Sequence, residues 1–105
     1  MTGDTIAGAS EPLSRLLGRW ICMDEWSTWV AIEIEWVPGQ RISVRATDTN
    51  DSENAEIYDV KFEGEVLEFA AHWSTGYFTK YKVRALGHHM EVTATYTRVD
   101  HFKKA

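Results

Sequence analysis

From Arg19 to Val99 the sequence alternates between apolar and polar residues with a period of two. Valine, isoleucine, threonine and aromatic residues dominate the alternating segments, which is typical of half-buried strands rather than of helices. Short connections between successive strands favour antiparallel pairing of sequence neighbours. The sequence therefore predicts an all-β antiparallel meander, whose expected strands are residues 19–26, 29–37, 41–47, 56–62, 65–73, 77–86 and 89–99.

Three glycine-containing connections set the expected register of the second half, because residues that pair across a hairpin share one face. They are a two-residue turn at 63–64, a three-residue loop at 74–76 and a two-residue turn at 87–88. The first of these turns pairs Val60 with Leu67. The three registers agree with one another and predict a common inner face, made of Tyr58, Val60, Leu67, Phe69, Ala71, Trp73, Tyr77, Tyr81, Val83, Met90, Val92, Ala94 and Tyr96.

In the first half, a three-residue Pro-Gly-Gln loop aligns Trp36 with Ile42. A three-residue loop at 26–28 aligns Trp20 with Ile34. Turn length matters here, because a shift of one residue turns every side chain of a strand to the other face. We therefore expect Trp20 to point into the same interior as the second half.

The length of 105 residues suits a single domain. We expect a flexible tail at 1–9, a short helix at 10–17, a β-barrel at 19–99 and a second tail at 100–105. The net charge of −5 disfavours binding of nucleic acid, which needs clustered basic side chains. No apolar run approaches the length of a membrane helix, and the first residues do not resemble a secretory signal. We therefore expect a cytoplasmic protein with no membrane partner.

The sequence Gly18-Arg19-Trp20 follows the expected short helix and leads into the meander, and it resembles the G-x-W motif of lipocalins and related calycin barrels. Residues 62–69 also look like hairpins of small bacterial barrels of that kind. The resemblance implies an antiparallel barrel of seven to eight strands that binds a small hydrophobic or amphipathic molecule in its cavity. In that family the tryptophan of the motif lies at the closed end of the barrel.

Strand direction predicts which inner residues lie at the other, open end of the barrel. Aromatic walls with a few polar groups at the mouth are typical of a small-molecule site. An arginine at such a mouth can hold a carboxylate or a carbonyl, and a half-buried carboxylate can act as a general acid or base. The same charged groups can instead form an ion-pair cluster that closes the barrel. The candidate ligand-binding residues are Asp24, Trp26, Glu56, Trp73, Tyr77, Tyr96 and Arg98.

Other reactive residue types do not predict a metal or cofactor site. The histidines are scattered over the expected strands and turns, and the polar loop at 48–54 lacks the glycine and the final glutamate of an EF-hand. Cys22, the single cysteine, is expected to be a small buried apolar group.

Three functions stay open from the sequence. The first is a carrier or sensor of a small apolar molecule. The second is a cofactor-independent cyclase, isomerase or dehydratase that uses the same cavity. The third is a protein-interaction module, such as an inhibitor or an immunity-type partner, that presents edge strands or an acidic face. The seven expected strands do not settle how the barrel closes. We therefore also expect a homodimer that forms through a sheet face or edge.

Overall fold

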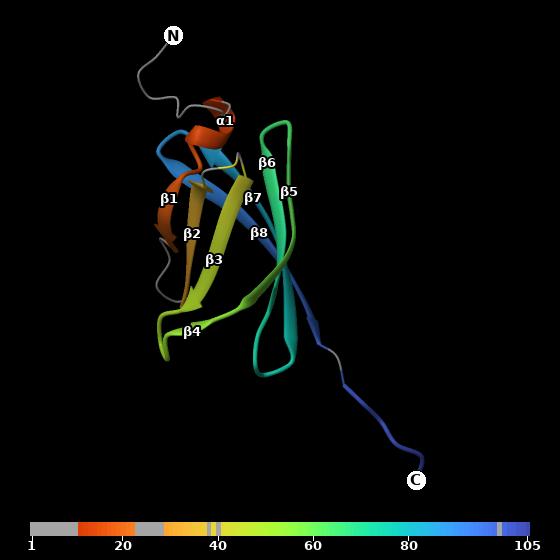
Figure 1. Ribbon diagram of the computed structural model, residues 1–105. Coiled ribbons are helices and arrows are strands. Elements are labelled where there is room, and N and C mark those ends of the chain that lie inside the picture. The colour runs from red at the N-terminus through yellow and green to blue at the C-terminus, as the bar shows by residue number, and fades with distance from the viewer. Residues whose placement is uncertain (1–10, 23–28, 38, 40, 99) are drawn as a thin grey trace.

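The chain folds into a short helix followed by antiparallel strands, shown in Figure 1 for the computed structural model. The structure describes residues 11–22, 29–37, 39, 41–98 and 100–105, and for Arg98 the backbone alone. Among these residues, no helix is long and apolar enough to cross a membrane. The elements are α1 (Glu11–Ser14), β1 (Gly18–Ile21), β2 (Val30–Val37), β3 (Arg41–Asp48), β4 (Glu53–Asn54), β5 (Glu56–Glu63), β6 (Val66–His72), β7 (Tyr77–Leu86) and β8 (His89–Arg98).

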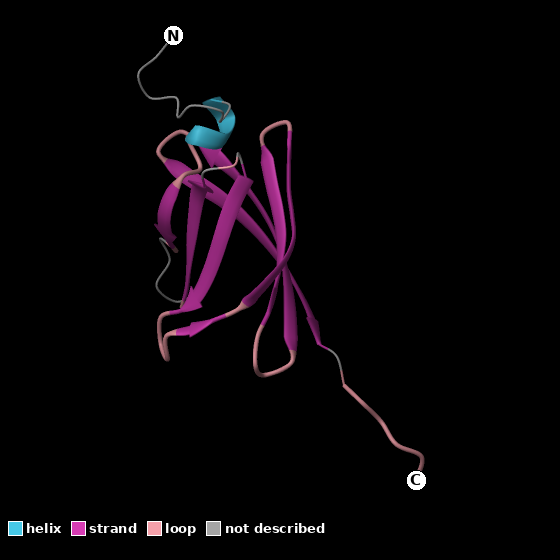
Figure 2. Ribbon diagram, viewed as in Figure 1, coloured by secondary structure: helices cyan, strands magenta, loops and turns pink. Residues whose placement is uncertain are grey.

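The strands form two four-stranded antiparallel sheets, ordered β1-β2-β3-β4 and β5-β6-β7-β8 (Figure 2). The chain passes from the first sheet to the second between β4 and β5, and β7 and β8 lie behind β1–β3 in Figure 1. The expected closed barrel is wrong for the described residues, because β1 and β8 do not pair.

The core lies between the two sheets and receives side chains from both. Leu16, which follows α1, is completely buried and covers one end of this core. The Trp20 indole Nε1 donates a hydrogen bond of 2.8 Å to the Leu16 carbonyl, which ties β1 to the helical turn. The buried cluster consists of Leu16, Ile32, Ile34, Ala46, Leu67, Phe69, Ala71, Trp73, Tyr81 and Val83.

Three of the predicted hairpin registers are confirmed. The β6–β7 hairpin pairs Phe69 with Tyr81, and the β7–β8 hairpin pairs Tyr81 with Ala94. The β2–β3 hairpin aligns Trp36 with Ile42, as expected. Both turns that flank β7 have the expected length, so the alternation places Leu67, Phe69, Ala71, Tyr81 and Val83 in the core as predicted. Tyr77, at the start of β7, was also expected inside but is 40% exposed.

The predicted β5–β6 register is wrong. Glu63 pairs with Val66, so the turn consists of residues 64–65, and Gly64 adopts a φ of 61°. A bulge between Tyr58 and Lys61 then shifts the pairing by one residue. As a consequence Tyr58 and Val60, which were expected inside, are 42% and 38% exposed, whereas Ile57 and Phe62 pack against the core.

The β1–β2 register also differs from the expectation, by two residues. Trp20 lies opposite Ile32 rather than Ile34. Because the shift is an even number, Trp20 keeps its inward direction and packs against the core. Cys22 is exposed, so the prediction that it is buried is wrong; it lies just beyond the last residue of β1.

Candidate functional site

A pocket of about 270 Å³ lies between the sheets at the end that holds the connections 49–52 and 74–76. The first sheet contributes one residue from the start of β2 and one from the end of β3, which are paired with each other. The second sheet contributes most of the wall. The lining residues are Val30, Asp48, Trp73, Thr75, Tyr77, Thr79, Tyr81 and Tyr96.

Strand alternation produces the aromatic wall of this pocket. Tyr77, Thr79 and Tyr81 are every second residue of β7, so their side chains share one face. Tyr96 lies opposite Thr79 on β8. Trp73 directly follows β6 and is 9% exposed, and its backbone N–H donates to the Tyr77 carbonyl at 3.0 Å. The result is a pocket with four aromatic side chains from three successive segments.

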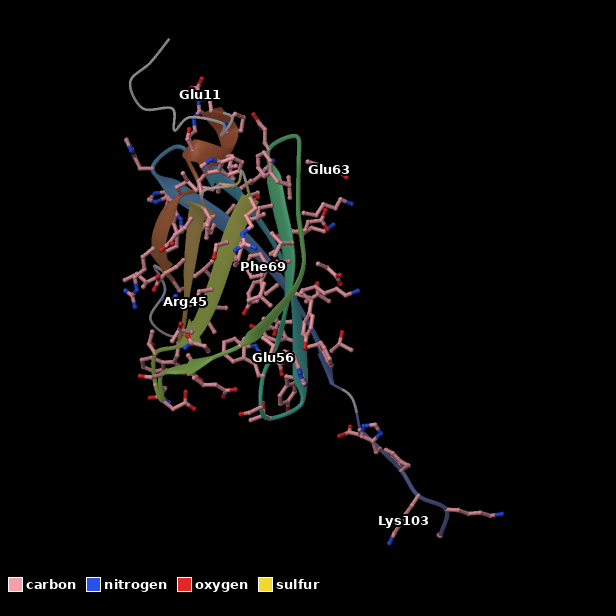
Figure 3. The ribbon with its side chains drawn as sticks, in the orientation of Figure 1. Glu11, Arg45, Glu56, Glu63, Phe69 and Lys103 are labelled. Carbon is pink, nitrogen blue, oxygen red and sulfur yellow. The ribbon has the colours of Figure 1, made fainter. Side chains whose placement is uncertain are left out.

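Tyr81 forms the deep part of the wall. Its ring stacks on Phe69 with a centroid distance of 5.0 Å and an interplanar angle of 25°, and Phe69 is seen between the two sheets in Figure 3. Burial raises the pKa of Tyr81 to about 12, and the neighbouring Tyr96 adds to the rise. The nearby Thr79 hydroxyl lowers the pKa through a hydrogen-bonding interaction and so offsets part of this rise, although the two side chains do not reach ordinary hydrogen-bond geometry. The Tyr81 phenol is therefore neutral at physiological pH.

Thr79 is 1% exposed, and its hydroxyl oxygen has no hydrogen-bond partner of ordinary geometry within the described part of the chain. A buried hydroxyl without a partner destabilises the folded state, and buried polar groups are normally paired. The oxygen belongs to a residue that lines the pocket. It can therefore form a hydrogen bond with a molecule that enters the pocket.

Carboxylates lie at the mouth. Asp48 lines the pocket, and its Oδ1 accepts a hydrogen bond of 2.8 Å from the backbone N–H of Asn50. Glu53 accepts two hydrogen bonds from Ser74, from the backbone N–H at 2.7 Å and from the hydroxyl at 2.9 Å. Glu53 belongs to the first sheet, whereas Ser74 follows the second strand of the other sheet. These bonds fasten the two sheets together beside the pocket.

The structure brings three of the predicted site residues together, namely Trp73, Tyr77 and Tyr96, which all line the pocket. Their role in ligand binding stays a prediction. Asp24 and Trp26 lie outside the described residues, as does the side chain of Arg98.

Glu56 is not part of the pocket. It accepts a hydrogen bond of 2.7 Å from the Tyr58 hydroxyl and lies 3.6 Å from His72 Nδ1. Figure 3 shows Glu56 at the start of β5. The expectation that Glu56 points inward fails because the β5 bulge was not foreseen, so the predicted group of Glu56 with Asp24 and Arg98 loses one acidic member.

The candidate ligand-binding set lacked five of the lining residues, namely Val30, Asp48, Thr75, Thr79 and Tyr81, although Tyr81 was expected on the inner face. The signal for Asp48 was present: the confirmed alignment of Trp36 with Ile42 extends along the two strands to pair Val30 with Asp48. Asp48 was instead assigned to a polar loop, which in the structure begins only after it.

A second pocket, of about 430 Å³, lies beside the start of β1 and the second half of β2. Its lining includes one aromatic side chain, Trp36, and the Arg19–Glu33 ion pair at 3.6 Å. The described residues contain no group of three or more histidine, cysteine or acidic side chains that could hold a metal ion. The pocket around Thr79 is therefore the better candidate for a binding site.

No protein-family model, curated protein or solved structure matched the chain. The resemblance of Gly18-Arg19-Trp20 to the lipocalin motif therefore stays a prediction.

Proposed function

We propose that the protein binds one small, partly apolar molecule in the pocket around Thr79. The observation that carries this proposal is the buried Thr79 hydroxyl, which has no hydrogen-bond partner among the described residues and lies within an aromatic wall. A ligand that forms a hydrogen bond with this oxygen removes the cost of leaving it unpaired. Aromatic side chains with a few polar groups are the usual lining of small-molecule sites.

The size of the pocket limits the ligand. Its 270 Å³ lies just below the range of about 300–1,000 Å³ that is common for ligand pockets. A molecule with one ring and a single polar group fits this volume better than a long lipid does. We therefore favour a carrier or sensor of a small, amphipathic compound.

Ligand binding can be tested by calorimetric titration with benzyl alcohol, benzylammonium and benzoate, which share one ring. At least one of the three is expected to bind the wild-type protein. Tyr96→Ala removes an exposed part of the pocket wall and is expected to weaken that binding. Tyr58→Ala is the matched control, because Tyr58 is also a partly exposed tyrosine but lies outside the pocket. Equal affinity in both variants would place the binding site elsewhere.

We also propose that a second copy of the chain pairs with β8, because one observation favours this interaction. Among the strands that the structure describes, β8 lies at the edge of its sheet and has 10 residues, and Val92 and Tyr96 on its inner face are 42% and 65% exposed. Long exposed edge strands are surfaces on which another chain can add a strand. Light scattering is expected to give a dimer mass that returns to the monomer in Val92→Lys. A monomeric wild-type protein at micromolar concentration would contradict this proposal.

A further inference from the structure

The side chains that line the pocket around Thr79 determine its electrostatic preference for a ligand. Four aromatic rings, from Trp73, Tyr77, Tyr81 and Tyr96, line it. The faces of aromatic rings are electron-rich and attract cations, most strongly where water is excluded. Trp73 and Tyr81 are almost completely buried, so the inner half of the wall is shielded from water. Such a wall favours a cationic group over an anionic one.

The charged side chains that the structure describes around the pocket have the same preference. The described lining includes one carboxylate, from Asp48, and no basic side chain. Glu53, which joins the sheets beside the pocket, adds a second carboxylate close to the mouth. Lys80, Lys82 and Arg84 alternate with the lining residues of β7 and therefore lie on the opposite face of that strand. The net charge of −5 also attracts cations to the protein as a whole.

The Thr79 hydroxyl favours a cation that carries an N–H group. An oxygen without a hydrogen-bond partner can accept a hydrogen bond from an N–H group. A primary or secondary ammonium group has such a donor as well as a positive charge. Each feature of the pocket therefore matches one feature of such a ligand. The aromatic wall contacts its apolar body, the Asp48 carboxylate attracts its positive charge, and the Thr79 hydroxyl oxygen accepts a hydrogen bond from its N–H group.

We propose that this pocket selects a small organic ammonium ion with an apolar body. The inference rests on the proposed function, because it names the class of ligand for that same site.

Three probes that share a ring and differ in charge test the selectivity: benzylammonium, benzyl alcohol and benzoate. In calorimetric titrations, benzylammonium is expected to bind roughly five- to tenfold more tightly than benzyl alcohol, with benzoate weakest. If benzyl alcohol or benzoate binds as tightly as benzylammonium, the ammonium proposal is overturned while the small-molecule site stands. If none of the three binds at millimolar concentration, both proposals fail.

A pair of variants tests the role of Asp48. Asp48→Asn removes the charge but keeps an oxygen that can accept from the Asn50 N–H. It is expected to lower the affinity for benzylammonium, relative to benzyl alcohol, by about two- to fivefold. Asp59→Asn removes the same charge from an exposed position on β5 outside the pocket, and is expected to leave this ratio unchanged. An unchanged ratio in Asp48→Asn would overturn the assignment.

Discussion

At the scale of single residues, Thr79 is the position where stability and binding conflict. Thr79→Val keeps the shape of the side chain and removes the buried hydroxyl, for which the described part of the chain provides no hydrogen-bond partner. We expect the free energy of unfolding to rise by about 1 kcal/mol, because the folded state no longer bears the cost of burying a hydroxyl without a hydrogen bond. Urea denaturation measures this change. Thr95→Val is the control, since Thr95 is exposed on the neighbouring strand; a loss of stability in Thr79→Val would show that the hydroxyl is paired.

The raised pKa of Tyr81 leads us to expect that the stability of the protein depends on pH in the alkaline range. Burial raises its pKa from the usual 10.0 to about 12. Between these values the unfolded chain loses the phenolic proton while the folded protein retains it, so stability falls as the pH rises. Tyr81→Phe keeps the ring that stacks on Phe69 and is expected to remove this part of the fall. Denaturation measured across this range tests it; an identical pH profile in both proteins would contradict the assignment.

At the scale of the elements, the bulge in β5 decides which side chains enter the core. Asp59 in this bulge adopts a φ of 56°, a conformation that asparagine and aspartate tolerate and β-branched residues do not. Asp59→Val is therefore expected to destabilise the protein by about 1–3 kcal/mol. Asp59→Asn should change stability little. Thermal denaturation of the two variants gives the comparison, and equal stability would mean that the bulge relaxes at no cost.

The same element shows where prediction from sequence stops. The registers of the two hairpins that share β7 could be predicted. In both hairpins the turn length and the position of the glycine agree with the alternation of core residues. In β5 the turn could be placed at 63–64 or 64–65, but these two registers differ by two residues and therefore bury the same face of the strand. Ile57 and Phe62 are both packed against the core yet are separated by an odd number of positions. A regular strand cannot turn both inward, so a bulge was the missing inference.

At the scale of the whole molecule, the two sheets are joined beside the pocket by the hydrogen bonds from Ser74 to Glu53. Glu53→Ala removes both bonds and is expected to lower the free energy of unfolding by about 1 kcal/mol. It should also weaken ligand binding, because the pocket is formed by both sheets. Glu65→Ala, in the turn at the other end of β6, is the control. Unchanged binding in Glu53→Ala would show that the pocket does not need this connection.

The alternation of residues predicted an all-β antiparallel chain and a concentration of aromatic residues at one end. It did not predict two separate sheets, because the alternation of residues does not specify whether the first and last strands pair with each other. The site was predictable where its residues lie on β7 and β8, whose registers are confirmed. It was not predictable on β5, where one extra residue reverses the direction of Glu56.

The most direct test of the binding site is a titration with benzylammonium and with benzyl alcohol, followed by two-dimensional ¹⁵N–¹H NMR. Our account predicts saturable shifts for the backbone amides of Trp73, Tyr77, Thr79, Tyr81 and Tyr96 with at least one of the two compounds. Amides at the opposite end of the second sheet, around residues 64–65, should not move. Shifts centred on Trp36 in the second pocket, or no saturable shifts with either compound, would contradict the proposal.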